Sequence, residues 1–241
     1  MDPFLYVVVG GALWGAIAGL LVPRAVYRLS VAPDEAWRDS CPDGHPVGGW
    51  VGLPRCAEGT HIGPRTLTVS LATALVCAAL AAATGPRPEL AVWLLLAPFG
   101  VLLAVVDFGV HRLPDVLTLP LAVAALVLLG GAALLPEHAG SLVHALYGGL
   151  GLGGAYFVLF LISPNGMGFG DVKLALSLGA VLGWYGWGAV LLGTFAGFLL
   201  AALYGGWLVV ARRAGRKTAI PFGPFLIGGA FLGLLVGAYA A

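Results

Sequence analysis

Long apolar stretches separated by short polar connections dominate this sequence and limit what the chain can fold into. A helix crosses a bilayer with roughly 20 apolar residues, and these stretches reach or approach that length. They are apolar on every side, whereas membrane β-strands alternate apolar and polar residues. Only 10% of the residues are charged, which is too few to cover the surface of a soluble domain of this size. We therefore expect an all-α polytopic membrane protein with about eight transmembrane helices.

The expected spans are Phe4–Leu21, Leu67–Ala83, Leu90–Val106, Val116–Leu135, Leu142–Ile162, Val172–Trp184, Ala189–Val210 and Phe222–Ala240. The first span is too long for a signal-peptide core and no positive residue precedes it, so we expect a retained helix. One sizeable polar segment, about residues 22–65, follows it. We expect two domains, namely residues 1–66 with the first helix and a small cytoplasmic domain, and residues 67–241 with the transmembrane core.

The positive charges predict the orientation of these spans. One side of the membrane would collect Arg24, Arg28, Arg38, Arg55, Arg65, Arg112, Lys173, Arg212, Arg213, Arg216 and Lys217. The other side would hold Arg87 alone. Because Lys and Arg near helix ends stay in the cytoplasm, we expect a multi-pass protein of the cytoplasmic (inner) membrane with both termini outside. The expected partner is the lipid bilayer, and no basic run indicates nucleic acid.

Three aspartates lie at the expected cytoplasmic ends of membrane helices, where an ionisable group indicates a functional site. Asp107 closes an apolar run, so it faces the unfavourable end of the helix dipole and is not explained by capping. An ion pair with Arg112 or Lys173 is the structural alternative for it. Asp115 and Asp171 each open a helix, where the ordinary role is that of an N-cap.

The stretch GMGFGDVKL sets glycines at positions 166, 168 and 170 directly before Asp171. One glycine is enough to enter a helix, and three on alternate positions leave the backbone bare. Such a loop lets an extended chain lie against it. Phe169 would then supply apolar contact. We expect Gly168, Phe169 and Gly170 to bind substrate.

Two carboxylates brought together at a membrane boundary can share one proton, because close like charges do not both ionise easily. One then acts as general base on water and the other as general acid on a carbonyl, which is the chemistry of peptide hydrolysis. The sequence holds no HExxH and no nucleophile elbow. A cation- or proton-coupled transporter with Asp107 and Asp171 as relay carboxylates is the alternative. Its binding groups belong near the bilayer midplane, whereas these acids lie at one face.

Four segments together resemble one family. MGFGDVKLALSLGAVLGW is similar to the GxGD signature of the type IV prepilin peptidases (leader peptidases), which are membrane aspartic proteases. VVDFGVHRLPDVLTLP resembles their first-aspartate segment, IPFGPFLIGGA their C-terminal motif, and GLLVPRAVYRLS the segment ahead of their cytoplasmic domain. The resemblance implies that Asp107 and Asp171 are the catalytic pair. Asp115 and Lys173 would support the site.

The resemblance also implies a substrate. It is a prepilin or pseudopilin precursor, cleaved after a glycine at the cytoplasmic membrane face. Cleavage would need no cofactor. Many members also N-methylate the new terminus with S-adenosylmethionine, but the acidic residue that such members carry after the cytoplasmic domain is replaced here by Ser70. Methylation therefore stays open.

The cytoplasmic domain departs from the family in a second way. Members with methyl transfer carry two Cys-x-x-Cys pairs, whereas this chain has Cys41, His45, Cys56 and His61 in SCPDGHPVGGWVGLPRCAEGTH. Both ligand types suit a tetrahedral structural zinc. The alternative is a glycine-rich loop with incidental cysteine and histidine. Three cysteines, with Cys77 inside a span, do not indicate a disulfide framework.

Overall fold

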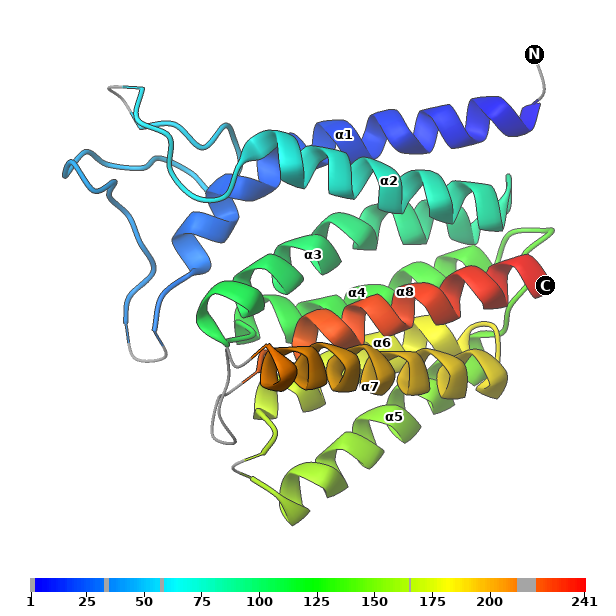
Figure 1. Cartoon of the computed structure of the whole chain (residues 1–241). Coiled ribbons are helices and arrows are strands. Elements are labelled where there is room, and N and C mark those ends of the chain that lie inside the picture. Colours follow the sequence, from blue (N-terminus) through cyan, green and yellow to red (C-terminus); the bar gives the residue numbers. More distant parts are fainter. Residues whose placement is uncertain (1–2, 33–34, 57–58, 165, 212–219) are drawn as a thin grey trace. The chain divides into compact units, whose positions relative to one another are not determined.

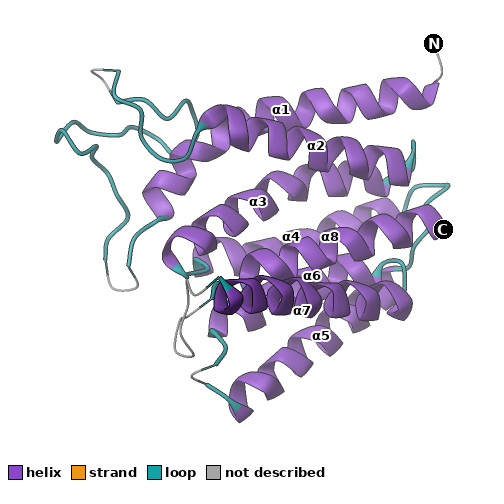
Figure 2. Ribbon diagram, in the orientation of Figure 1, coloured by secondary structure: helices purple, strands orange, loops and turns teal. Residues whose placement is uncertain are grey.

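The computed structural model describes residues 3–32, 35–56, 59–164, 166–211 and 220–241. Within those ranges the regular structure is helical, apart from two isolated β-bridges (Figures 1 and 2). The helices are α1 Pro3–Leu29, α2 Thr66–Thr84, α3 Glu89–Val110, α4 Asp115–Ala133, α5 Leu142–Ile162, α6 Phe169–Gly183, α7 Trp187–Val210 and α8 Gly223–Ala240. Seven of them are long and apolar enough to cross a membrane, and α6 is the one that falls short. The chain is an all-helical polytopic membrane protein, as the sequence predicts.

The helix bounds follow the apolar runs within a few residues: α3 ends at Val110 rather than Val106, α6 begins at Phe169 rather than Val172, and the largest difference is at the end of α1. That helix continues through Pro23 to Leu29 instead of ending near Leu21. Its last turns bury Val22, Val26 and Leu29, although Arg24 and Arg28 lie between them. The polar segment packs against this part of the helix, so burial against protein rather than lipid extends it. The polar segment therefore begins at residue 30 and not at residue 22.

The described chain forms two compact units, Met1–Pro114 and Asp115–Ala241. The first unit holds α1, α2 and α3, which pack on one another, together with the polar segment. The second unit holds α4 to α8. The expected functional division into residues 1–66 and 67–241 stays a prediction.

In the first unit, α1 and α2 lie in close contact. A methyl group added at Gly15 or Gly19 would collide with the backbone of α2, so small residues set this spacing. The Ser70 hydroxyl donates a hydrogen bond to the Ala16 carbonyl oxygen at 2.8 Å. Figure 1 shows the polar segment gathered at the shared end of α1 and α2.

In the second unit, α6 is the central helix. It contacts α4, α5, α7 and α8, and most of its 15 residues are buried. Glycines allow its contact with α5, since a methyl group at Gly148 would collide with the backbone at Gly179 and Gly183. With a rise of 1.5 Å per residue, α6 is about 22 Å long, which is shorter than the hydrocarbon core of a bilayer. Its neighbours, rather than lipid, surround it.

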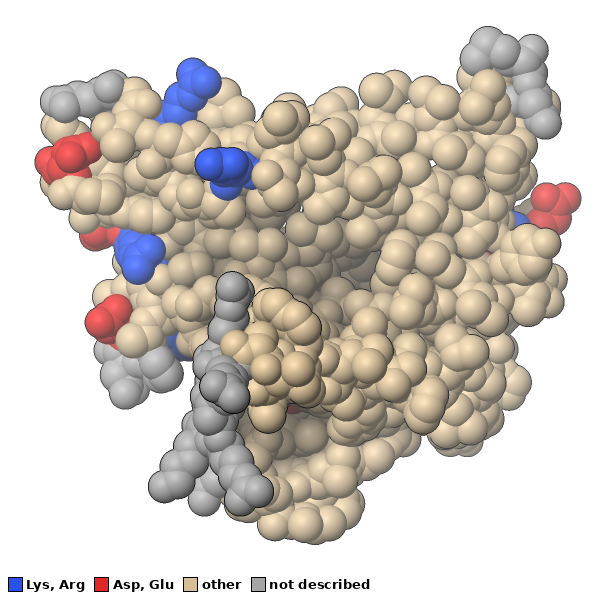
Figure 3. All heavy atoms as spheres, viewed as in Figure 1, with Lys and Arg blue, Asp and Glu red and all other residues tan. Residues whose placement is uncertain are grey.

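Charged side chains are sparse on the surface. Figure 3 shows a face made almost entirely of other residues, with only a few Lys, Arg, Asp and Glu side chains. This distribution is typical of a chain that spans a bilayer. Four of the basic residues that predict its orientation, Arg212, Arg213, Arg216 and Lys217, lie outside the described residues.

Candidate active site

Asp171 lies in the first turn of α6 rather than at its N-cap. The N-cap is Gly168, and the Asp171 N–H donates to the Gly168 carbonyl oxygen at 3.1 Å. The side chain is buried, with 7% of the residue exposed. A carboxylate in this turn is favoured by the positive end of the helix dipole. The fold thus holds a buried carboxylate at the N-terminal end of a central helix.

The glycines before Asp171 are not required by the backbone conformation. Gly168 has φ −72° and ψ 143°, which any residue adopts, and Gly166 and Gly170 are not among the glycines with positive φ. A Cβ atom at Gly168 would find only ordinary contacts, the nearest being 3.5 Å from Asp171 Oδ2. Gly170 lies inside the first turn of α6, not in a loop as expected. Among the described residues, a side chain at Gly168 would therefore meet only ordinary contacts beside the carboxylate.

Lys173 joins α6 to α4. Its Nζ lies 2.7 Å from Asp115 Oδ2, and Asp115 is the first residue of α4. The same ammonium lies 4.9 Å from the centre of the Phe169 ring, over its face. Phe169 is 45% exposed and contacts Phe160 of α5, with ring centroids 5.3 Å apart. This ion pair brings the expected supporting residues Asp115 and Lys173 together, and Lys173 is two residues along the chain from Asp171.

Tyr156 of α5 is a neighbour of Asp171 that sequence reasoning did not identify. The charge of the Asp171 carboxylate acts on its hydroxyl group. The residue is 1% exposed, and its hydroxyl oxygen has no hydrogen-bond partner among the described residues. Its ring packs against Phe198 of α7 and Phe222, which precedes α8. A tyrosine in an apolar span looks like core, so only the fold reveals this position.

Asp107 lies in the last turns of α3, in the first unit, and is buried. The helix ends at His111, which has a left-handed backbone (φ 53°) and donates its N–H to the Asp107 carbonyl oxygen at 2.8 Å. The two cations expected as alternative partners of Asp107 have other contacts. Arg112 donates to the Ala32 carbonyl oxygen at 2.7 Å, and Lys173 pairs with Asp115. The pairing of Asp107 with Asp171 stays a prediction.

The polar segment contains two turns of the same construction. In the first, the Cys41 N–H donates to the His45 carbonyl oxygen and the Gly44 N–H donates to the Cys41 carbonyl oxygen. In the second, Cys56 pairs in the same way with Thr60 and Gly59. The bridges Ser40–Pro46 and Arg55–His61 close the two turns at equivalent positions. Each turn thus presents a cysteine at its start, and only the first has a histidine four residues later.

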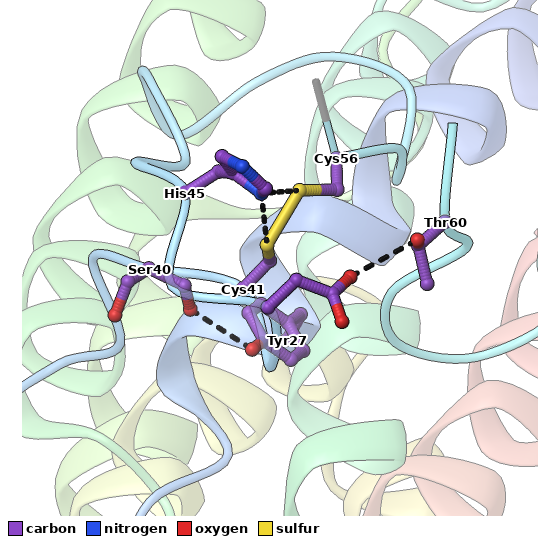
Figure 4. The surroundings of a disulfide bond; sticks show 7 residues. Tyr27, Ser40, Cys41, His45, Cys56 and Thr60 are labelled. Carbon is purple, nitrogen blue, oxygen red and sulfur yellow. Dashed lines mark hydrogen bonds between the residues drawn. A yellow bond between two sulfur atoms is a disulfide. The ribbon is translucent and has the colours of Figure 1, made fainter. Parts of the chain in front are cut away.

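Cys41, His45 and Cys56 come together, as Figure 4 shows. His45 Nδ1 lies 3.7 Å from Cys41 Sγ and 3.5 Å from Cys56 Sγ, and the three ligand atoms all lie within 4.8 Å of one another. The two cysteines form a disulfide, with Cα atoms 6.2 Å apart. Three cysteines did not indicate a disulfide framework, but the two turns bring Cys41 and Cys56 within the reach of one disulfide.

His61 does not join this cluster. Its Nε2 lies 3.3 Å from Thr66 Oγ1, and the side chain is exposed. The second turn places Thr60, not His61, at the position that His45 occupies in the first. One residue further along an extended backbone, the side chain points to the opposite side. The expected set of four metal ligands is thus reduced to three.

Comparison with known proteins finds relatives across most of the chain. Residues 93–206 match the model of the type IV leader peptidase family. A protein of Aeromonas salmonicida named prepilin leader peptidase/N-methyltransferase is 34% identical over 223 residues, which cover 90% of this chain and 73% of that relative. A Pseudomonas aeruginosa protein of the same name is 32% identical over 226 residues, covering 89% and 75%. No solved structure matches the chain.

The fold and these buried acids define a class of protein, namely a polytopic helical membrane protein with carboxylates held at helix ends. Within that class, the chain belongs to the type IV leader peptidase family. It is a membrane peptidase. The transporter alternative gains no support, since the relatives are named as peptidases.

Proposed function

We propose that this protein cleaves the leader from prepilin or pseudopilin precursors at the cytoplasmic face of the membrane, with Asp107 and Asp171 as the catalytic pair. The observation that carries this proposal is the environment of Asp171. A buried carboxylate lies in the first turn of a central helix, three residues after Gly168, where a Cβ would meet only ordinary contacts among the described residues. The names of the relatives supply the substrate class.

The topology supports the pairing. Consecutive spans alternate in direction, so the C-terminal end of α3 and the N-terminal end of α6 face the same side of the membrane. Asp107 and Asp171 lie at these two ends. Substrate binding would bring their carboxylates to one water molecule, because an unliganded aspartic site need not hold its catalytic distances.

The reaction then follows from two aspartates in opposite protonation states. The ionised carboxylate takes a proton from water, and the water oxygen attacks the carbonyl carbon of the scissile peptide. The protonated carboxyl gives its proton to the carbonyl oxygen, which yields a neutral tetrahedral intermediate. When the C–N bond breaks, the leaving amine takes a proton from the carboxyl that was the base. The carbonyl of the new carboxyl group forms as its hydroxyl proton returns to the other aspartate.

We propose that residues 166–170 bind the substrate residues on either side of the cleaved bond. Gly168 lacks a Cβ where neither its backbone angles nor its surroundings demand that absence. We explain this glycine by a substrate backbone that lies against it, since a side chain at position 168 would hold that backbone away. The exposed ring of Phe169 offers apolar contact to the first residues of the substrate helix.

Methylation of the new N-terminus by S-adenosylmethionine stays open. The relatives carry both activities in their names. In this chain Ser70 replaces the expected acidic residue, and its hydroxyl is used in the contact of α2 with α1. We therefore propose cleavage as the principal activity.

We also propose that Cys41, His45 and Cys56 hold a structural zinc ion when the two cysteines are reduced. Thiolate and imidazole are the ligands that zinc prefers, and the three atoms converge. The ion would join the two turns of the polar segment. A disulfide and a zinc site exclude each other, because the metal needs both cysteines as thiolates.

The decisive experiment is cleavage of a precursor with a Gly–Phe junction in membranes that contain this protein. Asp107→Asn and Asp171→Asn should each lower the cleavage rate roughly a thousandfold or more, because each removes one half of the acid–base pair. Asp43→Asn, which changes an exposed acid of the polar segment, is the matched control and should cleave at the parent rate.

Insertion of each variant is checked by protease protection of the membrane fraction. The catalytic pair is wrong if either variant inserts normally and cleaves as fast as the parent. The substrate class is wrong if the parent cleaves no member of a varied precursor panel. Mass spectrometry of the new N-terminus decides whether a methyl group follows.

A further inference from the structure

A short apolar loop interrupts the polar segment. Trp50, Val51 and Leu53 are exposed by 43%, 66% and 49%. They are the exposed large apolar side chains that the structure describes between residues 30 and 65. We call residues 48–53 the Trp50 loop. Exposed apolar side chains gathered in an otherwise polar segment indicate a surface that is covered in the working protein.

Arg24 of α1 binds this loop through its backbone. Its Nε and Nη2 donate to the Leu53 carbonyl oxygen at 3.1 and 2.7 Å, and Nη1 donates to the Gly48 carbonyl oxygen at 2.9 Å. A guanidinium offers its donors in a rigid fork, so these bonds fix the height of the loop along α1.

Arg28, one helical turn further along α1, fixes the orientation of Trp50. It donates to the Gly49 carbonyl oxygen at 2.7 Å. Its guanidinium also lies 4.1 Å from the centre of the Trp50 ring, over the ring face. Trp37 approaches the same ring edge-on, with centroids 6.5 Å apart. The indole is thus held between a cation and a second indole while 43% of the residue stays exposed.

The position of Arg24 along α1 places the Trp50 loop at the membrane surface. The uninterrupted apolar run of α1 ends at Val22. Arg24 follows within about 3 Å along the helix axis, at 1.5 Å per residue. The layer just outside the hydrocarbon is the headgroup region, where Trp and Arg side chains are favoured. The loop is therefore tied by its backbone to the depth that its side chains prefer.

We propose that the Trp50 loop inserts into the headgroup layer of the bilayer that α1 and α2 span, with Trp50, Val51 and Leu53 in contact with lipid. Arg24 is its tether. The polar segment is then not a freely projecting domain but is fastened to the membrane surface on which the peptidase acts. This inference does not depend on the identity of the substrate or of the catalytic residues.

Depth-dependent fluorescence quenching of the full chain in lipid nanodiscs tests it. A genetically encoded fluorescent amino acid replaces Val51 in one protein, Leu13 of α1 in a second and Pro42 of the first cysteine turn in a third. Each is mixed with lipids that carry a nitroxide either near the headgroup or near the end of the acyl chain. Iodide in the buffer reports exposure to water.

The proposal predicts three patterns. The label at Val51 is quenched about twofold more strongly by the headgroup nitroxide than by the deep one, since such segments enter the headgroup and acyl boundary. The label at Leu13, in the middle of a span, shows the reverse order. The label at Pro42 is quenched mainly by iodide. In Arg24→Gln, the lipid quenching at Val51 falls while that at Leu13, which reports insertion of the helix, is unchanged.

Two results would overturn the proposal. If the label at Val51 is quenched by iodide as strongly as the label at Pro42, the loop lies in water. If it is shielded from both iodide and lipid nitroxides, protein covers it, either this chain or another. Unchanged lipid quenching at Val51 in Arg24→Gln would remove the tether from the proposal.

Discussion

Lys173 Nζ lies 2.7 Å from Asp115 Oδ2, so one ion pair joins the N-terminal part of α6 to the first residue of α4. The Lys173 side chain is 17% exposed and the Asp115 side chain 63%. Water therefore screens the pair, and its contribution to stability is about 0.5–1 kcal/mol at most. The pair holds the turn that carries Asp171, so its effect should appear in activity more than in stability.

A double-mutant cycle on this pair tests that role. Lys173→Met and Asp115→Asn should each slow cleavage by about two- to fivefold, the equivalent of the ion-pair energy. The double variant should be little slower than either single variant, because the interaction is lost only once. The measurement is the initial cleavage rate in membranes at equal protein amount. Fully additive effects would show that the two residues act independently.

Removal of the Tyr156 hydroxyl should separate stability from activity. Tyr156→Phe keeps the ring packed between Phe198 and Phe222, and it deletes a buried hydroxyl without a partner. The melting temperature should therefore stay the same or rise, since an unpaired buried polar group is unfavourable. We expect cleavage to slow about tenfold in kcat with KM unchanged, because the dipole of the Tyr156 hydroxyl would no longer act on the nearby Asp171 carboxylate.

Tyr147→Phe on the same helix is the matched control for this change. Tyr147 is 57% exposed, so its hydroxyl is not enclosed beside Asp171. The control should cleave at the parent rate. Equal kcat values for Tyr156→Phe and the parent would assign Tyr156 to packing alone.

The contact of α5 with α6 predicts a sharp difference between two glycines. Gly148→Ala forces a methyl group into the backbone of α6 and should lower the free energy of unfolding by about 1–3 kcal/mol. Gly154→Ala meets nothing within 4 Å and should be neutral or raise it by up to about 1 kcal/mol. Thermal unfolding in detergent measures both. A destabilised Gly154→Ala with a stable Gly148→Ala would contradict the described register of the two helices.

The metal proposal predicts different effects for the two histidines of the polar segment. After purification under reducing conditions, His45→Ala should lose bound zinc and His61→Ala should retain it, since only His45 faces the two cysteines. Elemental analysis gives the zinc content per chain. Cys41→Ser is expected to behave like His45→Ala. Parent protein that binds no zinc when reduced would contradict the metal proposal and leave the disulfide and the Thr60–Asp43 hydrogen bond as the links between the turns.

The sequence predicted most of the helices because long apolar runs leave few alternatives; the bounds of α5, Leu142–Ile162, agree at both ends. It missed the last turns of α1 because Pro23 and Arg24 are typical of a helix end. In the structure, described residues of the polar segment pack on these turns, with Gly63 against Pro23 and Tyr27. The same limit applies to His61, which the spacing alone made a ligand. The structure instead places the His61 side chain beside Thr66.

Tyr156 and Asp171 show that local sequence patterns do not reveal contacts between helices. GMGFGD marks one carboxylate of the candidate site by its chemistry and its position before a helix. The residue that lies nearby in α5 is separated from it by fourteen intervening positions and by a turn, and an apolar run around it conceals its role. Contacts between helices, not periodicity within one, reveal it.

The short central helix α6 has a consequence for the range of membranes in which the protein works. A helix that faces lipid must match the thickness of the bilayer, or tilt or deform it. Because α4, α5, α7 and α8 surround α6, the depth of the Asp171 carboxylate is set by helix packing and not by the lipid. Bilayers that differ by a few ångströms in thickness would strain the outer helices while leaving the position of that carboxylate within its own unit unchanged.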